Sequence, residues 1–238
     1  MSSEPPKITK DNLSFLLYEL AKDYHKRTHG HGKAELVLVG GAVVISYYAF
    51  RLASFDIDGI INGDDELRDS IQAVADQENL DPKWLNDDFK MTSSYTPKLV
   101  LYSTYFGTFG HCLEVRRVLG PYLVAVKLRS FRPYRDLSDI VGILKVSDEK
   151  GEALSFEMIE KAYRDLYGET EELPAEARDF LERIFASDNL AKLFDAVVAE
   201  EKSNRETLVA LDKEESQALH QMNNFQILEA IKKRQGKK

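Results

Sequence analysis

The order of apolar and polar residues changes character along the chain. In the first 150 residues, short apolar runs bounded by turn-forming residues alternate with longer stretches that have one apolar face. The short runs predict strands at residues 36–39, 55–61, 99–106 and 113–118. The longer stretches predict helices, the first capped by Asp11, at residues 11–27, 42–52, 64–77, 120–133 and 136–146. This alternation predicts a mixed sheet flanked by helices.

The remaining part of the chain is predicted to be helical. Between Ser155 and Arg234 the apolar positions follow helical spacing, and the only glycine is Gly168. We therefore expect an α+β protein with a mixed domain at residues 1–148 and a helical C-terminal domain at residues 149–238. The sequence contains no internal repeat.

The composition is that of an ordinary globular protein. Hydrophobic residues make up 43% of the 238 residues and charged residues 30%, which excludes an intrinsically disordered chain. The formal net charge of -8 argues against general nucleic-acid binding. Cys112 is the only cysteine, so no internal disulfide is possible, as expected in a reducing compartment. Without a signal-peptide core or an apolar run of membrane-spanning length, we expect a cytoplasmic protein with no membrane partner.

Gly40 and Gly41 stand where a predicted strand meets a predicted helix. Two glycines allow the backbone to turn sharply and leave no side chain in the way of a phosphate group. The N–H groups at the start of the following helix can then point at that phosphate. The turn therefore predicts a phosphate-binding loop. The alternative is that the two glycines only pack the helix tightly onto the strand.

Asp56 and Asp58 form a second group with a predicted chemical role. On a strand these two side chains point to one side, whereas Phe55 and Ile57 point to the core. Two neighbouring carboxylates repel each other, and Mg²⁺ relieves that repulsion while it keeps positions for phosphate oxygens. We therefore predict a metal site at this pair. The alternative is an exposed strand end that carries two solvated aspartates.

A third group is basic. Residues 115–135 contain no acid, and their basic residues are Arg116, Arg117, Lys127, Arg129, Arg132 and Arg135. Positive side chains stabilise the negative charge that develops on a leaving pyrophosphate. Lys127 is the best single candidate for a phosphate contact. The alternative is a basic surface helix, and for Arg129 this is the preferred interpretation.

Two further groups have both a structural and a functional interpretation. Asp136 and Asp139, at the predicted start of a helix, fit a capping arrangement and an active-site role equally, and the two roles are compatible. The C-terminal end is basic and either contacts RNA or stays solvated. Its basic residues are Lys232, Lys233, Arg234, Lys237 and Lys238.

The order of these groups resembles the polymerase-β-like nucleotidyltransferase superfamily. Its members carry a Gly-Gly or Gly-Ser turn, a helix and an Asp-x-Asp pair on the next strand, as at residues 40–41 and 51–58 here. Residues 123–132 and 135–140 are similar to a later motif of one branch, with a lysine and an arginine on one helix and Arg-Asp-x-x-Asp opening the next. That branch includes toxins of bacterial toxin–antitoxin and phage-abortive-infection systems. The resemblance covers about residues 34–145.

The resemblance implies a polymerase-β-like fold and a metal-dependent nucleotidyltransferase. It implies that Mg²⁺ or Mn²⁺ is held by Asp56 and Asp58, and that these two residues act in catalysis with Lys127 and Asp136. The nucleoside triphosphate would be bound by Gly40, Gly41, Ser54, Lys127 and Arg132. The acceptor would be a tRNA end or a protein hydroxyl, and an antitoxin protein would be a further partner.

One departure from the superfamily pattern leaves the general base open. Many members place a third carboxylate on a later strand, whereas the strand predicted at residues 113–118 offers only Glu114. Asp136 or Asp139 can substitute for it only by folding back.

A non-catalytic interaction protein that keeps the fold is one alternative, favoured by the missing carboxylate and disfavoured by the retained aspartate pair and Lys127. A metal-dependent glycosyltransferase also uses Asp-x-Asp, but it normally has a longer nucleotide-binding half before that motif.

Overall fold

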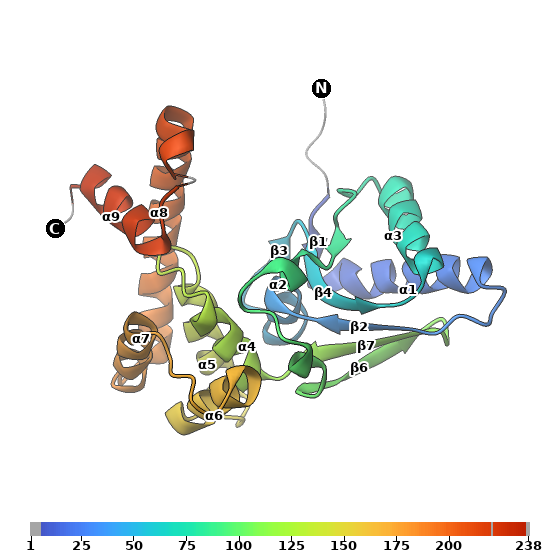
Figure 1. The fold of residues 1–238 in the computed structure, drawn as a ribbon, viewed down its shortest axis with the longest axis horizontal. Helices are drawn as coiled ribbons and strands as arrows, with labels where there is room; N and C mark the ends of the chain where they lie inside the picture. Colours follow the sequence, from blue (N-terminus) through green and yellow to red (C-terminus); the bar gives the residue numbers. More distant parts are fainter. Residues whose placement is uncertain (1–5, 220, 237–238) are drawn as a thin grey trace. The chain divides into compact units, whose positions relative to one another are not determined.

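The chain divides into two compact units, one ending at Leu123 and the other beginning at Val124. The computed structural model describes residues 6–219 and 221–236 (Figure 1), so the predicted basic residues Lys237 and Lys238 lie outside the described part. The expected domain boundary near residue 148 differs from this division. The reason is that the helix ending at residue 149 packs along a later helix of the C-terminal half, which makes it part of the second unit.

Unit 1 is built on a five-stranded mixed sheet with the order β5-β4-β2-β7-β6. Its strands are β2 (Ala34–Leu38), β4 (Ile57–Asn62), β5 (Leu85–Asn86), β6 (Ser103–Phe109) and β7 (Leu113–Val118). The central strand β2 runs antiparallel to β4 and parallel to β7. The expected mixed α+β class is therefore confirmed. The bounds predicted for β7 agree with the structure, whereas β4 begins later than predicted.

The prediction of a strand at residues 99–106 is wrong for its first residues and correct from Ser103 onward. Pro97–Val100 forms a short 3₁₀ helix (η3), and β6 starts only at Ser103. Pro97 stands in the first turn of η3, where its fixed φ angle suits a helical start, and the Thr96 side chain accepts a hydrogen bond from the N–H of Lys98. These local signals outweigh the apolar run that follows them. A second 3₁₀ helix, η2 (Asp88–Met91), precedes this region.

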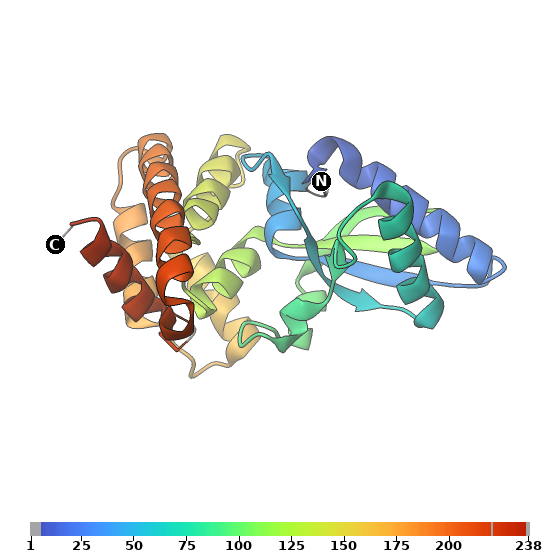
Figure 2. The ribbon, with the colours of Figure 1, turned by 90° about the horizontal axis from the view of Figure 1, so that it is seen from above.

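Two long helices pack against each other in unit 1, α1 (Lys10–Arg27) and α3 (Asp65–Glu78), as Figure 2 shows. The buried face of α1 repeats at helical spacing and consists of Leu13, Leu16, Leu17, Leu20, Ala21 and Tyr24. The cap of α1 is Thr9 rather than the predicted Asp11, because Thr9 and Asn12 satisfy each other's backbone N–H groups. Asp64 caps α3 as the pattern predicts, by accepting a hydrogen bond from the N–H of Leu67.

The helix predicted at residues 42–52 is shorter than expected. The helix α2 (Gly40–Val43) continues into a π-helical turn, η1 (Val44–Tyr48), which ends at Ala49 in the left-handed region with φ +59°. β-Branched and aromatic side chains dominate this segment and limit the length of a regular helix. The chain then forms the short strand β3 (Ala53–Ser54), which pairs with β1 (Ile8–Thr9) in a separate two-stranded ribbon.

Unit 2 is helical, as the sequence predicts. Its helices are α4 (Gly120–Arg129, which begins at the end of unit 1), α5 (Leu137–Glu149), α6 (Phe156–Tyr167), α7 (Ala175–Phe185), α8 (Leu190–Leu219) and α9 (Asn224–Arg234). α5 packs along α8, and α9 folds back against the end of α8 (Figure 1). Tyr134, Leu211, Leu219 and Ile231 form the buried contact at that end. None of the helices among the described residues combines the length and the apolar character needed to cross a bilayer.

Candidate functional site

The Gly40–Gly41 turn lies beside the start of β4. Antiparallel pairing of β2 with β4 brings the end of one strand to the beginning of the other, and the N–H of Val39 donates to the carbonyl oxygen of Asp58 at 3.1 Å. Gly40 has φ +53°, a left-handed conformation that favours glycine. A Cβ atom at Gly40 would lie 3.4 Å from Oδ2 of Asp58. The turn and the second aspartate therefore share one space.

Ser54 and Asp56 complete this group in unit 1. A Cβ atom at Gly41 would lie 3.7 Å from Oγ of Ser54, and that hydroxyl donates a hydrogen bond to Oδ1 of Asp56 at 3.2 Å. The structure thus brings together the residues that the sequence assigns to phosphate and metal in this unit. Two carboxylates, a hydroxyl and a turn without side chains form a donor set that suits Mg²⁺ together with phosphate oxygens. Among the described residues, no group of three or more His, Cys, Asp or Glu side chains is arranged to hold a metal.

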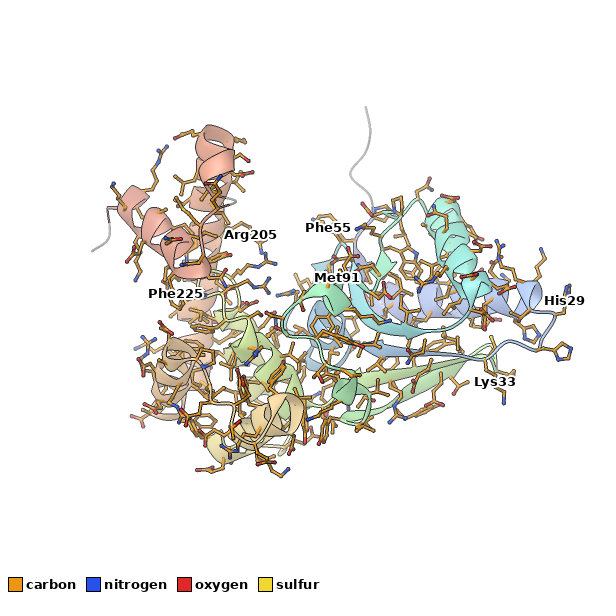
Figure 3. All side chains as sticks on the ribbon, in the orientation of Figure 1. His29, Lys33, Phe55, Met91, Arg205 and Phe225 are labelled. Atoms are coloured by element: carbon orange, nitrogen blue, oxygen red, sulfur yellow. The ribbon has the colours of Figure 1, made fainter. Side chains whose placement is uncertain are left out.

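The predicted alternation around Asp56 holds only in part. Ile57 is buried, as expected, but Phe55 is 46% exposed and lies at the surface (Figure 3). The reason is that β4 begins at Ile57, so Phe55 and Asp56 precede the strand and do not follow its alternation. The ammonium group of Lys7 lies 4.9 Å from the centre of the Phe55 ring. Asp56 is exposed, whereas Asp58 on β4 is half-buried.

Arg51 is a site residue that the sequence analysis did not single out. Its Nη1 atom lies 3.1 Å from the position that a Cβ atom would take at Gly41, so the guanidinium group flanks the turn. A signal for it was available, because Arg51 is the only basic residue between Gly41 and Asp58. A guanidinium group binds phosphate oxygens with two parallel hydrogen bonds. Arg51 therefore supplies positive charge within unit 1 itself.

The strand β7 places no carboxylate at the Gly40 end of the sheet. Glu114 pairs with Glu35 in the register of β2 and β7, near the opposite end of β2, so it does not take the place of the third carboxylate. Arg117 pairs with Leu38 at the Gly40 end, and its guanidinium group stacks on the ring of Tyr47 at 3.4 Å. Glu114 is therefore not placed to act on a group bound at the Gly40–Gly41 turn.

The other predicted site residues form a buried charge cluster in unit 2. The Nζ atom of Lys127 lies 2.6 Å from Oδ2 of Asp139 and 3.5 Å from Oδ1 of Asp136. Arg132 donates two hydrogen bonds to the carboxylate of Asp136, at 2.6 and 2.9 Å. Lys127 is 8% exposed, and each of the two aspartates is 2% exposed. Lys127 is therefore neither on a basic surface helix nor next to a surface carboxylate, because both of its partners are buried.

Asp136 stands at the N-cap position of α5, but its carboxylate makes no capping hydrogen bond. The capping interpretation is therefore wrong for this side chain, since Lys127 and Arg132 engage it instead. Burial alone would raise the pKa of the Asp136 carboxyl, yet these two cations hold the pKa below its usual value. Arg129 lies outside the cluster and is half-buried. It donates to the hydroxyl of Tyr163 at 3.0 Å and to Glu171 at 2.6 Å.

An alanine at Gly40 tests whether the space beside Asp58 is used for binding. Gly40→Ala is expected to lower the free energy of unfolding by about 1–2 kcal/mol, the cost of a left-handed residue with a Cβ atom. It is also expected to weaken binding of a nucleoside triphosphate with Mg²⁺, measured by titration calorimetry. Gly151→Ala is the matched control, because Gly151 also has a positive φ, +74°, but a Cβ atom there meets nothing within 4 Å. Equal triphosphate affinity in the two variants would mean that the Gly40–Gly41 turn takes no part in triphosphate binding.

Comparisons of this chain with models of protein families, with curated proteins and with solved structures gave no match.

Proposed function

We propose that this protein is a metal-dependent nucleotidyltransferase that moves a nucleoside monophosphate from a nucleoside triphosphate to a hydroxyl acceptor. The observation that carries the proposal is the shared space of the Gly40–Gly41 turn and the Asp58 carboxylate, with Ser54, Asp56 and Arg51 around it. A glycine turn next to a carboxylate pair can hold a phosphate chain and its divalent cation at the same place. The polymerase-β-like resemblance of residues 40–58 points to the same chemistry.

In the proposed reaction, the acceptor oxygen attacks the α-phosphorus and the bond from that phosphorus to the β-phosphate oxygen breaks. The products are a nucleotidylated acceptor and pyrophosphate, and the hydroxyl proton passes to a base. Asp56 and Asp58 would hold Mg²⁺ or Mn²⁺, which supplies Lewis-acid stabilisation of the reacting phosphate when bound. The Gly40–Gly41 backbone lets the phosphate chain approach without a steric clash. Arg51 would neutralise charge on the leaving pyrophosphate.

Roles for Lys127, Arg132 and Asp136 rest on the sequence resemblance. Lys127 and Arg132 are assigned to phosphate and Asp136 to catalysis, while the general base stays open, with Asp136 or Asp139 as candidates. In unit 2 these side chains form ion pairs with each other. A lysine has three N–H donors, so Lys127 can keep its aspartate partners while it donates to a phosphate oxygen. A base role for Asp136 would require a shift of its paired carboxylate, because its lowered pKa makes it a weak proton acceptor.

The test is transfer of label from an α-labelled nucleoside triphosphate, with each of the four bases, to bulk tRNA or to bulk protein. We expect tRNA to be labelled more readily, because the exposed Lys232 and Lys233 give a local positive charge after Ile231 despite the net charge of -8. Lys127 and Arg132 do not add to this charge at the surface, since they pair with Asp139 and Asp136. Phosphate contacts release counterions, so the transfer should fall at least about tenfold between about 50 and 200 mM salt. If label appears on protein alone, or if the amount transferred does not change with salt, the acceptor is not RNA. The proposal of a nucleotidyltransferase would still stand, with a protein as the acceptor.

A non-catalytic relative with the same fold is the second candidate. It is favoured by the position of Glu114 at the far end of β2 and by the pairing of Asp136 and Asp139 with cations. A protein of this kind would bind a nucleoside triphosphate with Mg²⁺ and transfer no label to tRNA or protein. Release of pyrophosphate from any of the four triphosphates in the presence of tRNA would exclude it.

A further inference from the structure

The first turn of α5 is capped by a residue from a different helix. Glu201 on α8 accepts a hydrogen bond from the backbone N–H of Ser138 at 2.8 Å through Oε1. Its other oxygen, Oε2, accepts one from the hydroxyl of Ser138 at 2.5 Å. A carboxylate at a helix N-terminus satisfies an otherwise unpaired N–H group and interacts favourably with the positive end of the helix dipole. Glu201 therefore does for α5 what an N-cap side chain normally does.

Glu201 occupies this position at an energetic cost. It belongs to the inward face of α8, on which Val197, Asn204 and Leu211 are buried at helical spacing. Burial raises the pKa of the Glu201 carboxyl; the bonds from Ser138 oppose the rise, and the negative charges of Asp139 and Asp136 add to it. A carboxylate on the buried face of a helix, close to two others, needs a structural reason. The hydrogen bonds to Ser138 supply that reason.

We propose that Glu201 is a positioning residue, which caps α5 from α8 and thereby leaves Asp136 and Asp139 to hold Lys127 and Arg132. The role of the cluster in catalysis rests on the proposed function, since only the resemblance assigns Lys127 to phosphate. The contact between Glu201 and Ser138 lies within unit 2, so its effect on Lys127 can be measured without any nucleotide.

Two demands compete for the carboxylate of Asp136. Asp136 stands at the N-cap, where an aspartate normally bonds the N–H groups of its own helix. Its two oxygens instead receive Arg132 and approach Lys127. A carboxylate that turns to cap Ser138 is expected to lose part of its two-bond geometry with Arg132. Without Glu201, the N–H of Ser138 loses its partner, and Asp136, at the N-cap two residues before it, is the residue whose side chain normally accepts such a bond.

The test follows the accessibility of the Lys127 amine. The full-length protein is treated with a small amine-acetylating reagent, and modification of Lys127 is followed by peptide mass spectrometry. Lys145 is the internal reference, because it lies on α5, pairs with Glu149 at 2.7 Å and has a more exposed side chain, 24% against 10% for Lys127. Glu201→Ala is expected to speed the acetylation of Lys127 relative to Lys145 by about tenfold, comparable to the loss of one hydrogen bond. Glu201→Gln, which keeps one acceptor oxygen for the N–H of Ser138, should restore most of the protection.

Glu200→Ala is the matched control, since Glu200 is the neighbouring, exposed glutamate of α8 and should leave the ratio unchanged. An unchanged ratio in a folded Glu201→Ala protein would overturn the proposal and leave Glu201 with a packing role only. If Glu201→Ala unfolds, all lysines react faster together, and Glu201→Met decides the matter by the same ratio, because it fills similar space and leaves the N–H of Ser138 without an acceptor oxygen. Triphosphate affinity is measured in parallel. Loss of Lys127 protection with unchanged affinity would support the positioning and count against the assignment of Lys127 to phosphate.

Discussion

Replacing both Asp56 and Asp58 by asparagine is expected to abolish Mg²⁺-dependent binding of the triphosphate and to lower label transfer at least about 100-fold. Asparagine keeps the size of each side chain but removes the negative charge that a divalent cation requires. The cation then loses its protein ligands, and the triphosphate loses the ion that joins it to the site. Titration calorimetry with Mg²⁺ or Mn²⁺ and the triphosphate measures the first effect, and the label assay measures the second.

The control for this double variant is Asp11→Asn with Asp65→Asn. Both of these residues are exposed aspartates in the first turn of a helix, so the control makes the same change in net charge away from the site. It should bind and transfer as the unmodified protein does. Unchanged Mg²⁺-dependent binding in Asp56→Asn with Asp58→Asn, with the circular dichroism spectrum intact, would refute a metal site at this pair.

Lys127→Ala is expected to lower the free energy of unfolding by about 3–5 kcal/mol, the cost of removing one partner from a buried ion pair. The truncation leaves Asp139 without its partner at 2.6 Å, inside a cluster where both aspartates are 2% exposed. Lys145→Ala removes a more exposed pair with Glu149 and should cost no more than about 1 kcal/mol. Urea denaturation of the two variants compares these values. A cost for Lys127→Ala as small as that for Lys145→Ala would mean that Lys127 does not stabilise the cluster.

The effect of Lys127→Ala should depend on pH in a defined direction. Asp136 has a lowered pKa in the folded protein, in part because of Lys127, so its ionised form stabilises the fold above the unfolded-state pKa of about 3.9. This stabilisation is lost as the pH falls through the lower pKa of the folded state. The difference in unfolding free energy between the unmodified protein and Lys127→Ala should therefore shrink below about pH 4. A difference that stays constant from neutral to acidic pH would contradict the coupling of Lys127 to Asp136.

Sequence patterns predicted those elements whose ends carry local chemical signals. Asp64 marks the start of α3, and the apolar alternation of residues 113–118 gave β7 its bounds. The pattern failed where a competing signal was overlooked. Thr9 caps α1 through its reciprocal bonds with Asn12, and Pro97 begins a 3₁₀ helix inside a predicted strand. These signals depend on one or two side chains, which a hydrophobic pattern averages out.

The candidate site was predictable as far as neighbours in the sequence define it. The residues of the candidate site in unit 1 all lie in one short segment of the chain, from the end of β2 to the start of β4, and the structure brings them together. They are Gly40, Gly41, Ser54, Asp56 and Asp58. Two features of the charge cluster in unit 2 could not be predicted from the sequence. Spacing along the chain does not reveal that the partners of Lys127 are buried, and Glu201 meets Ser138 from 63 residues away. Contacts of that kind depend on how α5 packs along α8, which no local pattern specifies.

The topology of the sheet has a consequence for the order in which the chain can fold during synthesis. The strand β2 gains its neighbour β4 early, but its other neighbour, β7, is complete only when the chain has been made to Val118. At about 5–20 residues per second, the β7-facing edge of the apolar segment Ala34–Leu38 then stays uncovered for several seconds. Uncovered edges of this kind recruit other strands. The nascent chain is thus expected to need chaperone protection in that interval, and a ribosome-stalled chain ending before Leu113 to aggregate more readily than one in which β7 has left the exit tunnel.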